Sequence, residues 1–254
     1  MNMNYQQEVI TLCQQLKLST VAKQAVVLSE TATRQQQDHL SYLHQLLSEE
    51  AEQRFLRRAA KKVREAHFPQ VKTLASFDFT QAPHLPESRL RQLAEGTYIN
   101  NAEPIIFLGE PGTGKTHLAT ALGYAAAQQG VSVRFVSASF LANSLIEAKD
   151  AHVLSKMTLH YQRFGVLIID ELGYLPLNKT DSELLFQVLS ARQEQKPVII
   201  TTNLPFSEWT SVFPDQRLCR ALVDRLTHKA HIIETGEQSC RLKDSLGGQL
   251  KHNP

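Results

Sequence analysis

Short apolar runs, each followed by a longer mixed stretch, recur along the chain from residue 105 onward. Five of these runs are predicted to be buried strands: Ile105–Leu108, Val133–Val136, Val166–Ile169, Pro197–Thr202 and Ala230–Glu234. The stretches between them are long enough for helices, such as His117–Gln129 and, after a capping turn at Asn178–Asp181, Ser182–Gln195. Strands alternating with helices predict an α/β fold with a parallel sheet covered on both faces, and place the active site at the carboxyl ends of the strands.

Helical periodicity replaces the strand-like runs in the first part of the chain. Apolar residues recur at helical spacing as Val9, Leu12, Cys13 and Leu16, and again as Leu40, Leu43 and Leu47 after Asp38, a residue type suited to an N-cap. A further helix is predicted over Ser48–His67, where Phe68-Pro69 closes it. We therefore expect a small helical domain at residues 1–68, a proline-punctuated connector at 69–100, an α/β core at 101–236 and a tail at 237–254.

A glycine-rich motif directly follows the first predicted strand. It matches G-x-x-x-x-G-K-[ST], and we expect nucleotide contacts from Gly109, Glu110, Pro111, Gly112, Thr113, Gly114, Lys115, Thr116 and the adjacent His117. Backbone N–H groups of such a turn wrap phosphate oxygens, helped by the positive end of the following helix. Lys115 would reach the outer phosphates and Thr116 would offer its hydroxyl to Mg²⁺. The motif between strand and helix predicts a protein that binds a nucleoside triphosphate.

Polar residues at two other strand ends complete this prediction. Asp170 and Glu171 follow the third strand, where one carboxylate can hold Mg²⁺ and its neighbour can orient an attacking water. We assign the metal to Asp170, together with Thr116, and the water to Glu171. Asn203 ends the fourth strand and is placed to sense the terminal phosphate or hold the water. Together these residues predict phosphoryl transfer to water.

Two arginines precede the fifth strand. Arg220 and Arg225 lie on a predicted helix, and an arginine inserted into a neighbouring subunit's site would stabilise charge on the transferred phosphoryl group. Either residue can fill this role, and Arg225 is favoured. Hydrolysis would then require assembly of several copies of the chain.

The most charged stretch lies at the end of the helical domain. Residues 51–75 carry seven basic and two acidic residues, a net charge of +5 in a chain whose total is only +2. The six basic residues expected to contact DNA phosphates are Arg54, Arg57, Arg58, Lys61, Lys62 and Arg64. Phosphate contacts of this kind give affinity without sequence choice.

Bulk composition narrows the class of protein further. The 254 residues are 42% hydrophobic, which suits one α/β domain and a small accessory region. Three widely spaced cysteines favour neither a disulfide framework nor a zinc site. Residues 1–15 do not look like a signal peptide and no run approaches a membrane span, so we expect a cytoplasmic protein without a membrane partner.

The linked motifs resemble those of a known family. GEPGTGKTHLA, VLIIDELGYLP, ITTNLPFSEW and ALVDRLTHKAHIIE, preceded by RRAAKKVREAHFPQVKTLASFDF, look like the IstB-like ATP-binding proteins, transposition helpers of bacterial insertion sequences. The resemblance runs from about Arg54 to Leu246. This family is similar to the DnaC helicase loaders and belongs to the AAA+ ATPases.

The resemblance implies an AAA+ ATPase core with a five-stranded sheet of order 5-1-4-3-2, and ATP as the nucleotide. It also implies a homo-oligomer on duplex DNA that recruits a partner transposase, with the site roles carried by the residues named above. Only 20 residues follow Glu234, so we expect no C-terminal lid and weak ATPase activity without DNA. A helicase loader is the alternative, because it would use the same ATPase residues.

Overall fold

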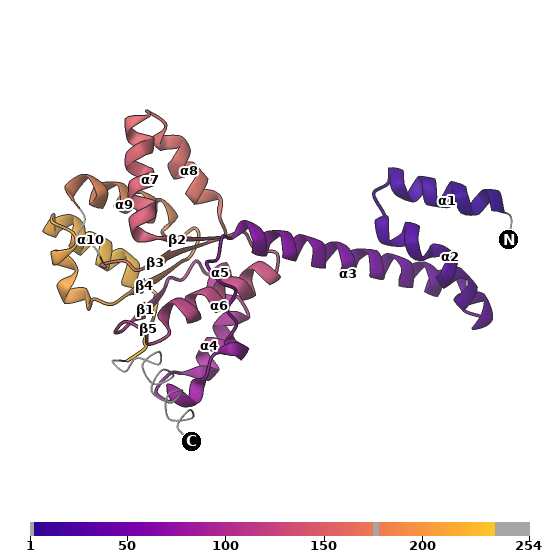
Figure 1. Cartoon of the computed structure of the whole chain (residues 1–254), viewed down its shortest axis with the longest axis horizontal. Coiled ribbons are helices and arrows are strands. Elements are labelled where there is room, and N and C mark those ends of the chain that lie inside the picture. Colours follow the sequence, from indigo (N-terminus) through magenta and orange to yellow (C-terminus); the bar gives the residue numbers. More distant parts are fainter. Residues whose placement is uncertain (1–2, 175–177, 237–254) are drawn as a thin grey trace, which may run out of the picture. The chain divides into compact units, whose positions relative to one another are not determined.

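The structure is a computed structural model that describes residues 3–174 and 178–236 of the chain. The chain divides into two compact units, residues 1–61 and residues 62–254, which are described separately below (Figure 1). The predicted tail at 237–254, and with it the predicted absence of a lid, lies outside the described residues. No described helix is long and apolar enough to cross a membrane.

The first unit is built from three helices, as the periodicity predicts. These are α1 (Met3–Gln15), α2 (Ser19–Arg34) and the longer α3 (His39–Glu65), of which the part up to Lys61 belongs to this unit. Their small core contains Cys13, Val21, Ala25 and Leu46. Asp38 accepts hydrogen bonds from the backbone N–H groups of Leu40 and Ser41, which confirms it as the N-cap. The helical segment around Leu40–Leu47 and the helix predicted over Ser48–His67 form one continuous helix, α3, which ends at Glu65, two residues before the predicted end.

The second unit contains one parallel sheet of five strands. The strands are β1 (Ile105–Leu108), β2 (Val133–Ser137), β3 (Val166–Asp170), β4 (Val198–Thr202) and β5 (His231–Glu234), in the spatial order β2-β3-β4-β1-β5. Read from the other edge, this is the predicted order 5-1-4-3-2. β1 therefore lies between β4 and β5, with Leu108 opposite Thr202 on one side and Glu234 on the other.

Two helical layers cover the faces of this sheet (Figure 1). One layer is formed by α7 (Ala138–Asp150), α8 (Leu154–Arg163), α9 (Lys179–Arg192), the short 3₁₀ helix η3 (Phe206–Ser211) and α10 (Gln216–Thr227). The other is formed by α6 (Lys115–Gln128), α4 (Glu87–Ala94) and α5 (Thr97–Asn100). Side chains alternate between the layers along each strand: Ile106 faces the first, whereas Ile105 and Phe107 face the second. The central strands β3, β4 and β1 are buried on both faces, as in other parallel sheets, whereas the edge strand β5 exposes Ile232 and Glu234.

The segment between the helical unit and the sheet packs beside α6. It contains two 3₁₀ turns, η1 (Leu74–Ser76) and η2 (Phe79–Gln81), followed by α4 and α5. Thr73 and Asp78 cap the two turns with their side chains. Phe77 and Phe79 pack against the same core as α6. This brings the segment close to the glycine-rich motif at residues 109–116, called the phosphate loop below.

Candidate nucleotide-binding site

The phosphate loop is fixed at its start by backbone hydrogen bonds to both neighbouring strands. Gly109 donates its N–H to Thr202 O, at the end of β4, over 3.2 Å. Glu110 donates its N–H to Gly236 O, which follows β5, over 3.1 Å. The loop therefore begins in a fixed position at the carboxyl edge of the sheet, where the alternation of strands and helices predicts the active site.

Side-chain contacts with the end of β5 hold the middle of the loop. The hydroxyls of Thr113 and Thr235 lie 2.6 Å apart, and both residues are almost fully buried. Glycine is required at position 109, because its φ of 155° is rare for other residues and a β-carbon there would lie 2.4 Å from Thr235 Oγ1. The shape of the loop thus depends on a contact between residues 122 positions apart.

Lys115 and Thr116 open α6 and carry the two polar groups of the motif. Lys115 Nζ donates to Gly109 O over 2.6 Å and to Glu110 O over 2.7 Å, so the ammonium lies over the loop's own carbonyls. Thr116 Oγ1 donates to Asp170 Oδ1 over 3.0 Å. A hydroxyl and a carboxylate from separate elements therefore meet beside the loop, and both are oxygen ligands of the kind that Mg²⁺ prefers.

The acidic pair at the end of β3 has two different environments. Asp170 is buried and also accepts a hydrogen bond from Thr201 Oγ1 over 2.6 Å. Glu171 is exposed and has a φ of 59°, a left-handed conformation that costs on the order of 1 kcal/mol for a residue with a β-carbon. Its backbone N–H donates to Thr201 Oγ1 over 2.8 Å. Backbone strain is thus found at the residue expected to orient the water.

Asn203 completes the group of strand-end residues. It directly follows β4 and is half-buried. Because β4 lies between β3 and β1, Asn203 lies between the acidic pair and the phosphate loop. The residues predicted separately at three strand ends therefore meet at one edge of the sheet.

A cleft of about 700 Å³ opens beside the phosphate loop, within the range of small-molecule sites. Its walls come from α6 and the loop on one side and from residues 69–81 on the other. Phe77 lines the cleft and packs on Gly114, where a β-carbon would lie 2.6 Å from the ring. This position is compatible with two roles for Phe77, a contact beside the base of a bound nucleotide and an anchor for the connector.

His117 lines the cleft and also contacts the connector. Its Nε2 lies 3.0 Å from Thr73 O and 3.3 Å from Ser76 Oγ, and its ring meets Phe77 edge-on with centroids 5.1 Å apart. Burial lowers the pKa of His117 and the nearby Lys72 lowers it further, although the hydrogen bond to Thr73 acts in the opposite direction. The ring is therefore neutral at pH 7, and Nε2 carries the hydrogen because a carbonyl can only accept. His117 ties the connector to α6.

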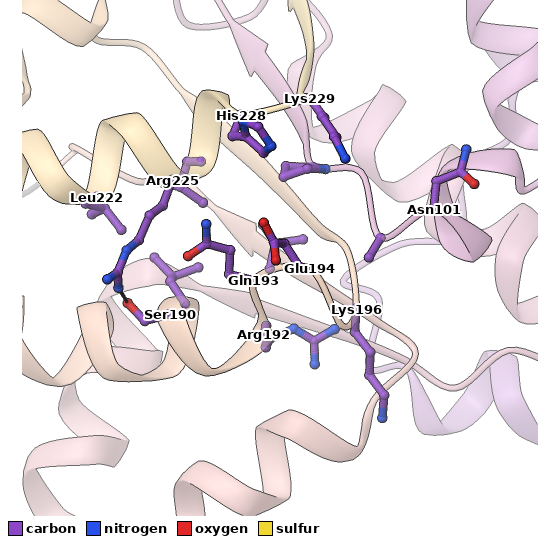
Figure 2. Close-up of a pocket in the computed structure, with 15 residues that line it drawn as sticks. Asn101, Ser190, Arg192, Gln193, Glu194, Lys196, Leu222, Arg225, His228 and Lys229 are labelled. Atoms are coloured by element: carbon purple, nitrogen blue, oxygen red, sulfur yellow. Dashed lines mark hydrogen bonds between the residues drawn. The ribbon is translucent and has the colours of Figure 1, made fainter.

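Arg225 lies at the opposite edge of the sheet from the phosphate loop, where it lines a separate pocket with Ser190 and Gln193 (Figure 2). It belongs to the last turn of α10, just before the amino end of β5, whereas the loop follows the carboxyl end of β1. Its Nη1 donates to Ser190 Oγ over 2.6 Å, and its guanidinium lies 4.9 Å from the centre of the Phe186 ring. Arg220, on the same helix, is exposed. Because a four-residue strand spans about 13 Å, Arg225 does not belong to the phosphate site of its own chain.

The six basic residues of α3 fall into two groups. Arg54 and Arg57 place Nη2 at 3.1 Å and 3.4 Å from Glu50 Oε1, a carboxylate that is buried in the first unit. The other oxygen of Glu50 accepts backbone N–H bonds from Thr20 and Val21 at the start of α2. Burial raises the pKa of Glu50, but these N–H groups and Arg54 lower it more, so its pKa lies below the ordinary value.

Arg54 and Arg57 therefore help to join α2 to α3. The remaining members of the group are Arg58, Lys61, Lys62 and Arg64. Lys62 lies 3.7 Å from Glu65, one turn away on α3, and Arg58, Lys61 and Arg64 are exposed. These four are the better candidates for contact with an external polyanion.

Sequence reasoning missed two residues that shape the site. Thr201 bridges the acidic pair, and Thr235 holds the phosphate loop. A partial signal existed for both, since each is a hydroxyl residue at the carboxyl end of an apolar strand. The residues that they contact lie on other strands, so the sheet order had to be known first.

A parallel sheet of this order, with a phosphate loop after β1 and an acidic pair after β3, defines an AAA+ nucleotide-binding protein. A family model described as IstB-like ATP binding protein matches residues 11–247. The chain therefore belongs to the IstB-like ATP-binding proteins.

Relatives and solved structures agree with this assignment. The inferred ATP-binding protein of insertion sequence IS21 from Pseudomonas aeruginosa is 35% identical, with 93% of this chain and 89% of the relative covered. The corresponding protein of IS5376 from Geobacillus stearothermophilus is also 35% identical, with 91% and 92% covered. The fold is similar to that of AMPPCP-bound DnaA from Aquifex aeolicus (TM-score 0.58, 20% identity, 74% and 57% covered). It is also similar to the DnaC helicase loader (TM-score 0.54, 24% identity, 64% and 95% covered).

Proposed function

We propose that this protein is an ATPase that assembles on duplex DNA and helps a partner transposase to select or use target DNA. The observation that carries the proposal is the meeting of Lys115, Thr116, Asp170 and Glu171 at one sheet edge, in a chain whose relatives are named for insertion sequences. The second candidate function is helicase loading, which is favoured by the likeness to DnaC along 95% of that chain. Both functions use the same ATP site.

ATP would bind in the cleft with its phosphates on the loop. Lys115 would exchange the carbonyls of Gly109 and Glu110 for the outer phosphate oxygens. Thr116 and Asp170 would hold Mg²⁺, which supplies charge neutralisation for the phosphates when bound. Glu171 would orient the attacking water and accept its proton.

Subunit contacts would complete the site. Arg225 lies at the edge of the sheet opposite its own phosphate loop, so it can contact a terminal phosphate only in a neighbouring copy of the chain. Ser190 and Phe186 hold its guanidinium in the isolated chain. Hydrolysis would therefore increase with assembly, and DNA that binds many copies would promote it.

The rate of ATP hydrolysis tests the function directly. The purified protein is assayed alone, with duplex DNA and with single-stranded DNA, over a series of protein concentrations. We expect duplex DNA to stimulate the rate, and the rate to rise more steeply than linearly with protein concentration. Stimulation by single strands alone would support the helicase loader instead, and a full rate in dilute monomer would contradict both assembly and the trans-acting arginine.

Replacing Arg58, Lys61 and Arg64 together by Ala is expected to weaken duplex binding for all sequences. Each lost phosphate contact removes one released counterion, so the slope of log K against log salt should become shallower by up to about 0.9 per residue. Binding is measured by fluorescence anisotropy with two unrelated duplexes. The matched control is Lys23→Ala, Lys149→Ala and Lys156→Ala, three exposed basic residues outside α3. Unchanged binding by the α3 variant would remove this group as the DNA contact.

A further inference from the structure

Thr201 contacts both members of the acidic pair, Asp170 and Glu171, but does not line the cleft. It lies on β4 next to β3, and its side chain is fully buried. Its Oγ1 donates to Asp170 Oδ1 over 2.6 Å and accepts the backbone N–H of Glu171 over 2.8 Å. Its carbonyl accepts the N–H of Leu172 over 2.9 Å. One residue therefore contacts three consecutive positions of the segment that carries the chemistry.

The hydrogen bonds of this hydroxyl have one consistent arrangement. Asp170 as a carboxylate can only accept, so the single hydroxyl hydrogen goes to it, and a lone pair is left for the N–H of Glu171. The first bond fixes the orientation of the carboxylate that faces Thr116. The second helps to hold Glu171 in its left-handed conformation, which a non-glycine residue adopts only where surrounding contacts impose it.

We propose that Thr201 is a positioning residue for ATP hydrolysis. Its hydroxyl couples the orientation of the metal-binding carboxylate, Asp170, to the backbone that directs the water-orienting carboxylate, Glu171. The proposal rests on the function proposed above, because it assigns Thr201 a part in that same site. Removal of the hydroxyl should reduce turnover far more than it reduces ATP affinity, since the phosphate loop is held by other contacts.

Two substitutions at position 201 itself form a matched pair. Thr201→Val removes the hydroxyl and keeps the size and β-branching of the side chain at this fully buried position. Thr201→Ser restores the hydroxyl without the methyl group, so it separates hydrogen bonding from packing.

The experiment measures kcat and KM for ATP in the full-length protein with duplex DNA, together with the Mg²⁺ concentration that gives half-maximal ATP binding. Loss of a residue that orients a metal ligand typically costs 10- to 100-fold in activity or metal affinity. We expect Thr201→Val to lower kcat by about 10- to 100-fold with KM within about threefold, and to raise the Mg²⁺ half-point. Thr201→Ser should recover kcat to within about threefold.

Two outcomes would overturn the proposal. A wild-type kcat in Thr201→Val would show that the hydroxyl positions nothing, and equal losses in Thr201→Val and Thr201→Ser would indicate a packing effect. Failure of the proposed function gives a different result, in which the wild-type protein itself hydrolyses no ATP with or without DNA. In that case the role in hydrolysis fails too, and an unchanged Mg²⁺ half-point in Thr201→Val would also remove the role in orienting Asp170.

Discussion

Glu171→Gln should abolish ATP turnover while leaving ATP binding intact. The amide keeps the size of the side chain but cannot accept a proton from the attacking water, a role worth on the order of 10²- to 10⁴-fold in rate. ATP affinity should persist, because Lys115 and the phosphate loop are unaffected. The measurements are kcat for ATP hydrolysis with duplex DNA and the Kd for ATP in the presence of Mg²⁺.

Glu194→Gln is a closely matched control for this variant. Glu194 is also exposed and has a φ of 58°, close to the 59° of Glu171, but it lies between α9 and β4 at the other edge of the sheet (Figure 2). The same substitution in the same backbone conformation should leave kcat near the wild type. If Glu171→Gln retained turnover, Glu171 would lose its role as the water-orienting residue.

Arg225→Ala is expected to lower kcat by about 10³-fold or more, the loss typical of an arginine supplied from a neighbouring subunit. The physical reason is the charge that builds on the transferred phosphoryl group, which under the proposed function the guanidinium would neutralise in the assembled state. Arg220→Ala is measured beside it, because the sequence left both arginines open for this role. Thermal unfolding of each variant reports whether loss of the Ser190 and Phe186 contacts destabilises the fold.

A mixing experiment decides whether the arginine acts in trans. Glu171→Gln and Arg225→Ala proteins are each expected to be inactive alone. In a random 1:1 mixture about one interface in four joins an intact Glu171 to an intact Arg225 from the neighbour, so activity should return to about a quarter of the wild-type rate. Continued inactivity in mixtures that still assemble on DNA would place the arginine in its own site or give it another role.

The local parts of the structure could be predicted from the sequence, because local signals specify them. The glycine-rich motif lies between β1 and α6 as expected, and Asn178 and Asp181 form the capping box of the following helix. That helix begins at Lys179 and ends at Arg192, three residues earlier at both ends than predicted, because the first turn lies inside the capping motif. The short helices α4 and α5 were missed because eight and four residues carry little periodicity.

Contacts between strands that are far apart in the sequence could not be predicted in the same way. The role of Thr201 depends on β4 lying beside β3. The hydrogen bonds of the buried Arg192 depend on the same two strands being neighbours. Arg192 gives its guanidinium hydrogens to backbone carbonyls that include Tyr161 O and Pro197 O, with no acid within ion-pair distance among the described residues. Burial lowers its pKa to about 10, so it remains charged at pH 7. Nothing in the sequence distinguishes Arg192 from a surface arginine at the end of a helix.

The hydrogen bonds that join the phosphate loop to Thr235 and Gly236 have a consequence during synthesis of the chain. The phosphate loop leaves the ribosome well before Thr235 and Gly236, because Thr235 follows its contact partner Thr113 by 122 positions. Until β5 has been made and has paired with β1, the loop lacks the backbone partner of Glu110 and the hydroxyl partner of Thr113. A nascent chain therefore carries the complete motif long before the loop has the contacts that fix its shape. Under the function proposed above, ribosome-bound copies would not join ATP-dependent assemblies until β5 has paired with β1.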